Sequence, residues 1–307
     1  MGQQNLTVLT EFILMGVTRR PELQLPLFGI FFIIYMVTVV GNMGMIILTK
    51  LDSRLRIPMY FFIRHLAFVD LGNSTVICPK MLVNFMVDQN TISYSACGTQ
   101  MAFCIVFIVS ELFILSAMAY DRYVAICSPL LYNVIMSLRL CHLMVGIPYL
   151  YSTFQALMFT IKIFTLTFCG SDIINHFYCD IVPLLPMLCS NAWEIELSII
   201  LFSAFNLISS LLVVLMSYML ILLAIFRMRS AEGRKKAFST CGSHLTMVVV
   251  FFGSLLFMYV QPKSTHSYDT DKMASVFYTL VIPMLNPLIY SFRNKEVKNA
   301  FRRVFKN

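Results

Sequence analysis

Two carboxyl side chains, Asp70 and Glu111, lie in the middle of long apolar segments. Asn42 and Asn286 occupy comparable depths in two further apolar segments. A charge inside a membrane span costs about 2.5–3.5 kcal/mol on insertion scales, so such residues are candidates for function. Two interpretations are open: a buried site for a cation or a shared proton, or an interhelical hydrogen-bond network without an ion. Both require the four segments to meet inside one structure.

Two short motifs lie near the ends of such segments. Asp121 directly precedes Arg122, so its carboxylate can hold the guanidinium in a pair that a competitor could release. Asn286 precedes Pro287, which frees a backbone carbonyl that the asparagine could bind and predicts a kink. Pro283 predicts a second distortion one turn earlier. An anchoring charge and a static kink are the simpler interpretations.

Seven apolar stretches must position these residues. A hydrocarbon core about 30 Å thick needs roughly 20 apolar residues in a helix. The expected spans are 25–49, 58–79, 98–122, 140–161, 197–226, 237–260 and 272–292, and an amphipathic helix follows over 293–306. In that tail, Val297, Phe301, Val304 and Phe305 repeat at helical spacing among basic residues. The expected fold class is an all-α membrane protein: a single seven-transmembrane helix bundle domain over residues 1–307, with the amphipathic helix on the inner leaflet.

The composition excludes an ordinary soluble protein. Hydrophobic residues make up 59% of the chain and charged residues 12%, whereas soluble domains hold about 25% charged residues. Of the 23 Lys and Arg residues, 17 fall in segments 50–64, 121–139, 227–236 and 292–307. The positive-inside rule places these segments in the cytoplasm and the N-terminus outside. Asn5 begins a glycosylation sequon in that outer tail.

Four cysteines fall in segments that are expected outside, where oxidising conditions favour disulfides. They are Cys97, Cys169, Cys179 and Cys189. Four cysteines allow three pairings, and their spacing does not choose among them. The long segment 162–196 holds three of the four, so disulfides are expected to fix this connection over the bundle. No cysteine or histidine spacing predicts a metal or a cofactor.

Five motifs mark the ends of the expected helices. They are PMYFF over 58–62, MAYDRYVAIC over 118–127, SY over 217–218, KAFSTCGSHL over 236–245 and PMLNPLIYS over 283–291. With the outer cysteines, they resemble the rhodopsin-like G-protein-coupled receptors and, much more closely, the odorant (olfactory) receptors of the tetrapod-type (class II) branch. Three features depart from that branch: Arg56 stands in Leu55-Arg56-Ile57-Pro58 where His is common, Arg64 adds positive charge at the start of the second span, and Phe252 stands where Tyr is common.

The resemblance implies roles for residues that spacing leaves open. It implies disulfides Cys97–Cys179 and Cys169–Cys189, and a site for Na⁺ or a shared proton at Asp70 and Glu111. It implies a G-protein switch formed by Asp121, Arg122, Tyr123, Tyr218, His244, Asn286 and Tyr290. It implies a ligand pocket lined by Cys104, Ile105, Ile108, Val109, Phe202, Asn206, Phe252, Leu256, Tyr259 and Thr279.

The implied activity is that of an odorant receptor and not of an enzyme. A small, mostly apolar volatile would bind in the outer half of the bundle. The receptor would then activate a stimulatory, olfactory-type heterotrimeric G protein and raise cAMP. The implied partners are the odorant, the G-protein α subunit and membrane lipid, without nucleic acid. The implied location is the plasma membrane in the cilia of olfactory sensory neurons, with the N-terminus extracellular and the C-terminus cytoplasmic.

Two other classes of protein are alternatives. An ion-coupled transporter or channel could use Asp70 and Glu111 as an ion path, but the sequence shows no inverted repeat with matching broken helices. An intramembrane enzyme would need a nucleophile with its base, or a metal cluster, inside the spans. Neither an H-x-x-x-H nor a G-x-S-x-G motif is present.

Overall fold

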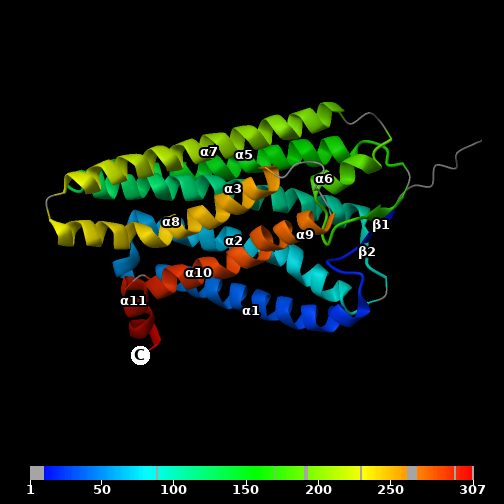
Figure 1. Cartoon of the computed structure of the whole chain (residues 1–307), viewed down its shortest axis with the longest axis horizontal. Coiled ribbons are helices and arrows are strands. Elements are labelled where there is room, and N and C mark those ends of the chain that lie inside the picture. The colour runs from blue at the N-terminus through cyan, green and yellow to red at the C-terminus, as the bar shows by residue number, and fades with distance from the viewer. Residues whose placement is uncertain are drawn as a thin grey trace, which may run out of the picture.

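Seven helical rods run side by side in a computed structural model that describes residues 10–87, 89–169, 171–189, 193–228, 230–260, 268–293 and 295–305 (Figure 1). Six are continuous helices: α1 Pro21–Leu51, α2 Pro58–Asn84, α3 Tyr94–Cys127, α5 Leu138–Phe164, α7 Trp193–Arg227 and α8 Ala231–Val260. The seventh rod consists of α9 Tyr268–Val276, the π-helical turn η3 Phe277–Val281 and α10 Ile282–Arg293. The expected seven-helix bundle is confirmed.

The helices are long enough to cross a membrane. The continuous ones have 27 to 35 residues, which at 1.5 Å per residue exceeds a hydrocarbon core of about 30 Å. Among the described residues, six segments meet both the length and the apolarity of a span, and α8 contains the shorter apolar segment His244–Leu256. Several helices extend past the expected spans; α3 begins early because the Ser93 side chain accepts a hydrogen bond from the Ala96 N–H.

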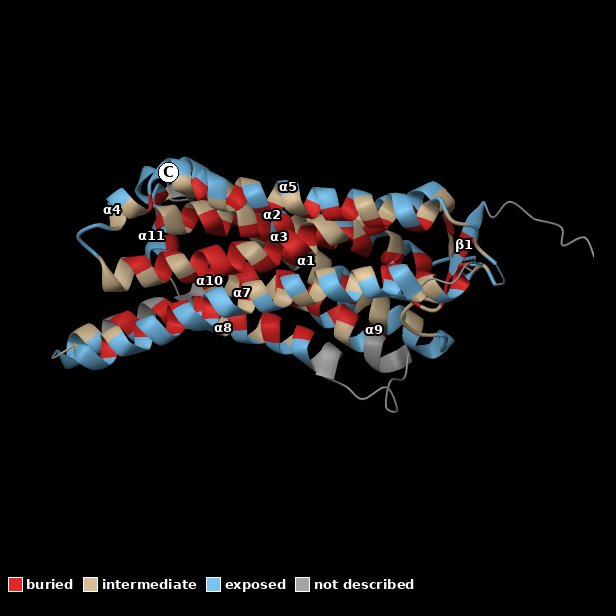
Figure 2. Ribbon diagram, turned by 90° about the horizontal axis from the view of Figure 1, so that it is seen from above, coloured by how far each residue is buried: buried red, intermediate tan, exposed pale blue. Residues whose placement is uncertain are grey.

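The core of the bundle lies around α3, which packs against α2, α5 and α7. Figure 2 shows that α3 is buried along most of its length, whereas the outer faces of its neighbours are exposed. Those outer faces are apolar: Ile33, Leu150 and Met216 are 62%, 75% and 64% exposed. Exposing such apolar faces to water is unfavourable in free energy, whereas exposing them to lipid is not. The bundle therefore has the surface of a membrane protein.

A small sheet, which the sequence pattern does not predict, closes one end of the bundle. β1 Glu11–Leu14 pairs antiparallel with β2 Thr91–Ser93 and parallel with β3 Ile173–Ile174. Phe12 and Leu14 are buried and alternate with exposed Glu11 and Ile13, the two-residue period of a strand. This end is called the sheet end below.

The opposite end, called the basic end below, carries the 3₁₀ turn η1 Ser53–Leu55, α4 Tyr132–Ile135 and α11 Lys295–Phe305. Figure 2 shows α4 and α11 at the end opposite β1. The expected amphipathic helix is confirmed as α11, which turns away from the direction of α10. Val297 and Ala300 are buried against the bundle, and Lys298 is exposed. The guanidinium of Arg303 donates two hydrogen bonds to Asp52 Oδ2, at 2.6 and 3.1 Å. The side chains of Val304 and Phe305 lie outside the described part of the chain.

The seventh rod is distorted near its prolines and packs closely against α1. The π-turn ends directly before Ile282-Pro283, where a distortion was expected. Pro287 has no N–H to offer the Pro283 carbonyl, and the side-chain amide of Asn42 donates to that carbonyl instead, at 3.0 Å. A Cβ on Gly41 would lie 2.8 Å from Pro287 Cγ, so glycine permits this approach. The idea that Asn286 binds the freed carbonyl is wrong, because its amide is turned toward α2.

Candidate ligand site and signalling switch

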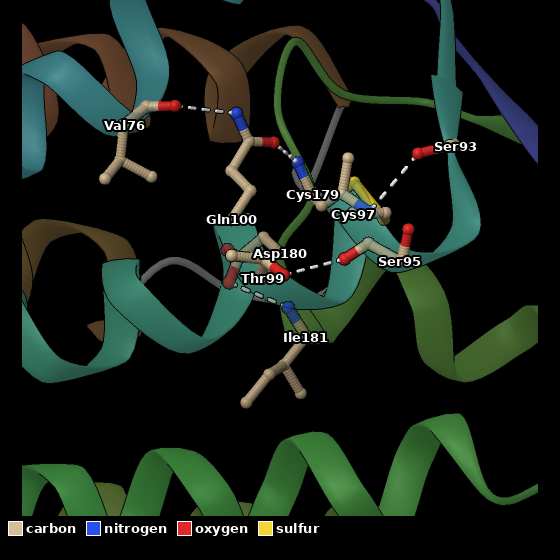
Figure 3. Close-up of a disulfide and its surroundings, with 10 residues drawn as sticks. Val76, Ser93, Ser95, Cys97, Thr99, Gln100, Cys179, Asp180 and Ile181 are labelled. Carbon is tan, nitrogen blue, oxygen red and sulfur yellow. Dashed lines mark hydrogen bonds between the residues drawn. A yellow bond between two sulfur atoms is a disulfide. The ribbon is translucent and has the colours of Figure 1, made fainter.

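Two disulfides fix the long connection between α5 and α7 at the sheet end. Cys97, near the start of α3, is bonded to Cys179, and Cys169 is bonded to Cys189 within the connection. These are the two pairs that the resemblance implies. The Gln100 side-chain carbonyl accepts from the Cys179 N–H at 2.8 Å, and its amide donates to a backbone carbonyl of α2 at 2.9 Å (Figure 3). One disulfide and one glutamine thus join the connection to α3 and α2.

A series of hydrogen-bonding side chains, called the outer polar chain below, continues from this connection to the seventh rod. The Tyr178 hydroxyl lies 3.4 Å from Asp180 Oδ2 and 2.8 Å from the Tyr278 hydroxyl. The Ser275 hydroxyl lies 3.3 Å from the Tyr278 hydroxyl and 3.2 Å from His176 Nε2. All of these except Asp180 are buried. The outer polar chain was not among the expected site residues, although its signal in the sequence is the group of His, Tyr and Asp residues around a disulfide cysteine.

Burial controls the protonation of both ends of the outer polar chain. It lowers the pKa of His176 to about 3, and the positive charge of Lys272 acts in the same direction. The ring is therefore neutral at physiological pH, and its Nδ1 has no hydrogen-bond partner among the described residues. Burial also raises the pKa of Asp180, against the effect of hydrogen bonds from the Ile181 N–H and the Tyr178 hydroxyl. The outer polar chain can thus present hydroxyl and imidazole groups for hydrogen bonding while the His176 ring stays uncharged.

The residues expected to line the ligand pocket lie on α3, α7, α8 and η3, in the half of the bundle nearer the sheet end. Cys104, Val109, Asn206, Phe252 and Thr279 are buried, Ile105, Ile108 and Phe202 are half-buried, and Leu256 is 37% exposed. The side chain of Tyr259 lies outside the described residues.

Asn206 is turned toward α5, where its Oδ1 accepts from Tyr151 at 2.8 Å and its Nδ2 donates to Gln155 at 3.0 Å. The hydroxyl of Thr279 donates to the Ser275 carbonyl. Both polar groups therefore already have partners, and the remaining expected wall is mainly apolar.

A polar core lies midway along the bundle. Asn286 Nδ2 donates to Asp70 Oδ2 at 2.7 Å, which joins α10 to α2. Glu111 lies on α3, which packs against the α2 helix that carries Asp70. Both carboxyl groups are buried, and within the described residues neither forms an ion pair with a basic side chain. Asp70 Oδ1, Glu111 Oε1 and Asn286 Oδ1 have no hydrogen-bond partner there. Such oxygen atoms fit either a hard cation or a proton on one carboxyl group.

At the basic end, Asp121 holds Arg122. Arg122 Nη2 lies 2.8 Å from Asp121 Oδ2, and the Tyr132 hydroxyl of α4 donates to Asp121 Oδ1 at 2.7 Å. Burial and the charge of Asp121 raise the pKa of Tyr132, so the hydroxyl keeps its proton and remains the donor. Tyr123 is half-buried, with its ring 6.0 Å from that of Tyr120. Arg122 is thus paired within its own helical turn.

His244 connects three helices in an arrangement called the His244 latch below. Its Nε2 lies 3.1 Å from the Leu115 carbonyl of α3, and its Nδ1 lies 2.7 Å from the Tyr218 hydroxyl of α7. A carbonyl can only accept, so Nε2 carries the proton and Nδ1 accepts from Tyr218. The buried hydroxyl of Tyr290 has no hydrogen-bond partner among the described residues. The structure thus joins Tyr218 and His244 directly and leaves a buried hydroxyl of α10 open to a new partner.

These features define a seven-helix receptor of the G-protein-coupled class. The crystal structure of squid rhodopsin shares this fold, with a TM-score of 0.74 over 94% of this chain and 86% of that chain, at 18% sequence identity. The sequence pattern of the family described as olfactory receptor matches residues 31–307. Human olfactory receptor 8K5 is 80% identical over 307 residues, the whole of both chains, and mouse olfactory receptor 8U3 is 57% identical over 303 residues, covering 99% of this chain and 95% of its own. The chain belongs to the olfactory receptor family.

Proposed function

We propose that this receptor binds a small, mostly apolar volatile in the half of the bundle nearer the sheet end and activates a stimulatory, olfactory-type heterotrimeric G protein, which raises cAMP. The outer polar chain carries this proposal. Its hydroxyl groups and neutral imidazole come from the loop and the seventh rod, and Tyr178 packs in one apolar cluster with Cys104 of the expected pocket wall. Such a surface favours a ligand with an apolar body and one polar function.

The same proposal orients the receptor in the plasma membrane of olfactory cilia. The sheet end and the N-terminus face outside, and the basic end faces the cytoplasm. The support is that 17 of the 23 Lys and Arg residues fall in the four segments at the basic end, since basic loops are retained in the cytoplasm. Asn5, in a glycosylation sequon of the N-terminal tail, agrees with this orientation but lies outside the described residues.

Ligand and G protein are coupled through α8. Phe252 and His244 are eight residues apart on this helix, which is about two turns. A ligand that binds one tilt of α8 better than the other shifts the population toward that tilt. Movement of α8 away from α3 breaks the bond between His244 and the Leu115 carbonyl. The basic end then opens to the C-terminal helix of a G-protein α subunit, and Arg122 becomes available to it.

The polar core supplies a second control in this proposal. Asp70 and Glu111 would hold a Na⁺ ion through their orphaned oxygens, or would share one proton between them. Either species offsets the repulsion between two buried carboxylates. Because Asn286 of α10 is bound to Asp70, the occupied core stabilises the arrangement in which α2 and α10 are joined. A movement of α10 during activation would therefore compete with the ion or proton.

A cell assay tests the proposal. The full chain is expressed with an olfactory-type α subunit, exposed to a panel of volatiles and monitored for cAMP. Removing one hydrogen-bonding hydroxyl with Tyr278→Phe should shift agonist potency roughly 2- to 10-fold, and Tyr259→Ala should also shift it. Leu150→Ala, on the exposed outer face of α5, is the matched control and should leave potency unchanged.

Two results would contradict the proposal in different ways. No cAMP response to any volatile, from receptor that is present at the surface, would argue against odorant activation through this G protein. Unchanged dose–response curves in both Tyr278→Phe and Tyr259→Ala, for several agonists, would remove these residues from the ligand site.

A further inference from the structure

A cavity of about 410 Å³ lies at the basic end, between the turn that joins α1 to α2 and the start of α5. This size is within the roughly 300–1,000 Å³ of small-molecule sites. Its charged lining is entirely basic, since Lys50, Arg56 and Arg64 line it and no acidic side chain does. The cavity is remote from the expected ligand pocket, which lies toward the sheet end.

The positive charge of this cavity is largely uncompensated. Arg64 is held in place by two hydrogen bonds that it donates to Thr49, at 3.2 Å to Oγ1 and 2.6 Å to the carbonyl. Thr49 is neutral, so these bonds fix the guanidinium without cancelling its charge. Lys50 and Arg56 are exposed, and neither side chain makes a hydrogen bond or ion pair with another described residue. Asp52, in the same turn, is already paired with α11. An anion entering the cavity would meet three cations.

The rest of the lining is apolar and partly faces outward. Ile57 and Leu138 both line the cavity and are 45% and 69% exposed. The Phe61 ring forms part of the wall between the rings of His65 and His142, with centroids 4.7 and 4.9 Å away. A freely soluble anion would leave Ile57 and Leu138 in water, whereas an amphiphile would cover them. The mouth lies where three membrane-spanning helices begin or end, which is the depth of lipid headgroups.

We propose that this cavity binds the phosphorylated headgroup of an anionic phospholipid from the leaflet at the basic end. The phosphate lies against Lys50, Arg56 and Arg64, and the acyl chains leave past Ile57 and Leu138 along the outer faces of α2 and α5. The lipid would hold the α1–α2 turn against the start of α5, and binding requires neither odorant nor G protein.

Native mass spectrometry of the purified full-length receptor in a neutral detergent tests this inference. Phosphatidylinositol 4-phosphate is titrated, with phosphatidylcholine as the uncharged comparison and inositol 1,4-bisphosphate as the soluble headgroup. The anionic lipid should form one-to-one adducts at concentrations at which the other two do not. Removing two cations together with Lys50→Gln and Arg56→Gln should weaken this binding roughly 30-fold, since each cation near a membrane surface contributes about 1 kcal/mol.

Two further variants make the test specific. Arg139→Gln removes an exposed basic residue at the start of α5 that does not line the cavity, and it should bind the lipid as the unmodified receptor does. Leu138→Glu places a negative charge at the exposed mouth and should also weaken binding. All four substituted residues are exposed, so an unchanged melting temperature is expected for each variant.

Three outcomes would overturn the inference. The first is equal lipid binding by the double variant and the unmodified receptor. The second is equal binding of phosphatidylcholine, which would assign the adduct to general lipid contact. The third is equal binding of the soluble inositol bisphosphate, which would make the cavity a soluble-anion site. None of these outcomes affects the proposed odorant response, because the measurement contains no odorant and no G protein.

Discussion

The His244 ring accepts a hydrogen bond from the Tyr218 hydroxyl, 2.7 Å away, while it donates one to the Leu115 carbonyl. One imidazole therefore joins α8 to both α7 and α3. All of these groups are buried, and a buried polar group that loses its partner costs about 1–3 kcal/mol. Moving α8 thus requires new partners for both Tyr218 and Leu115. Arg122 of α3 is paired with Asp121 in its own turn. In the described structure, α8 is bonded to α3 through His244.

Replacing His244 with Phe should raise basal cAMP. The ring volume is nearly kept, but two hydrogen bonds that favour the closed arrangement are lost. At about 1 kcal/mol for each bond, the closed-to-open ratio should fall roughly 30-fold. Basal cAMP is measured without odorant and divided by surface receptor. Leu245→Ala, the adjacent and 41% exposed position, is the control and should leave basal cAMP unchanged. Normal basal activity of the His244 variant would show that the latch does not restrain α8.

Replacing Arg122 with Ala should abolish odorant-stimulated cAMP. The single change also leaves Asp121 buried without its cation, and breaking a buried pair costs about 3–5 kcal/mol. The decisive variant is therefore Arg122→Ala together with Asp121→Asn, which removes both charges. Surface delivery should recover in the double variant while signalling stays absent. A cAMP response from that double variant would refute a direct role of Arg122 in G-protein engagement.

Most of the scaffold could be predicted because hydrophobic segments and basic loops leave long patterns in the sequence. The sheet could not be, since β1, β2 and β3 have only 4, 3 and 2 residues, too few for a periodic signal. The π-turn Phe277–Val281 was also hidden, because proline predicts a distortion but not its form. Asn42, not Asn286, binds the carbonyl freed by Pro287, since a neighbouring helix can supply the donor.

The candidate site was predicted less completely, because its contacts join distant parts of the chain. Tyr178 and Tyr278 are 100 residues apart in the sequence, yet their hydroxyls lie 2.8 Å apart, and Tyr178 directly precedes Cys179 of the Cys97–Cys179 disulfide. The similar depths of Asn286 and Asp70 in their helices correctly predicted that these two residues lie side by side. Depth does not predict the direction in which a side chain points. Asn206 was expected to face a ligand, but its side-chain amide is hydrogen-bonded to Tyr151 and Gln155 of α5.

Replacing Cys97 with Ser should prevent surface delivery. Its disulfide closes a separation of 82 residues and positions the loop that carries His176, Tyr178 and Asp180 of the outer polar chain. Loss of a native disulfide typically costs about 2–5 kcal/mol. Surface antibody staining divided by total receptor measures the effect. Cys127→Ser, which changes a free and half-buried cysteine, should be delivered normally. Normal delivery of the Cys97 variant would mean that folding does not depend on this disulfide.

Replacing Asp70 with Asn should remove any stabilisation by Na⁺. If the polar core holds this ion, Na⁺ at ten times its dissociation constant stabilises the folded receptor by about 1.4 kcal/mol. The melting temperature of purified receptor should then rise when Na⁺ replaces choline, and Asp70→Asn should not respond. Asp52→Asn, a carboxylate outside the polar core, should respond as the unmodified receptor does. An equal Na⁺ response in all three proteins would place the ion elsewhere, and no response in any would favour the shared proton.

The pair formed by Asp52 and Arg303 should determine how firmly α11 is held, in a way that depends on acidity. Hydrogen bonds from Arg303 lower the pKa of Asp52 below its ordinary value of 3.8. Because the pKa of Asp52 is lowered, the Asp52–Arg303 ion pair contributes its full stabilisation above pH 3.8. This stabilisation is lost as the pH falls through the lower pKa that Asp52 has in the folded protein. A spin label at the exposed position 299 of α11, introduced as Asn299→Cys, reports the mobility of the helix.

Mobility of that label should be constant from neutral pH down to about pH 4, set by the ordinary carboxyl pKa, and should increase below it. Asp52→Asn and Arg303→Gln should each increase mobility at neutral pH, and combining them should add little, because both remove the same interaction. Arg302→Gln removes the neighbouring exposed charge and should change nothing. Additive effects of the two substitutions, or an equal effect of Arg302→Gln, would mean that general charge attraction to the membrane, and not this pair, holds α11 in place.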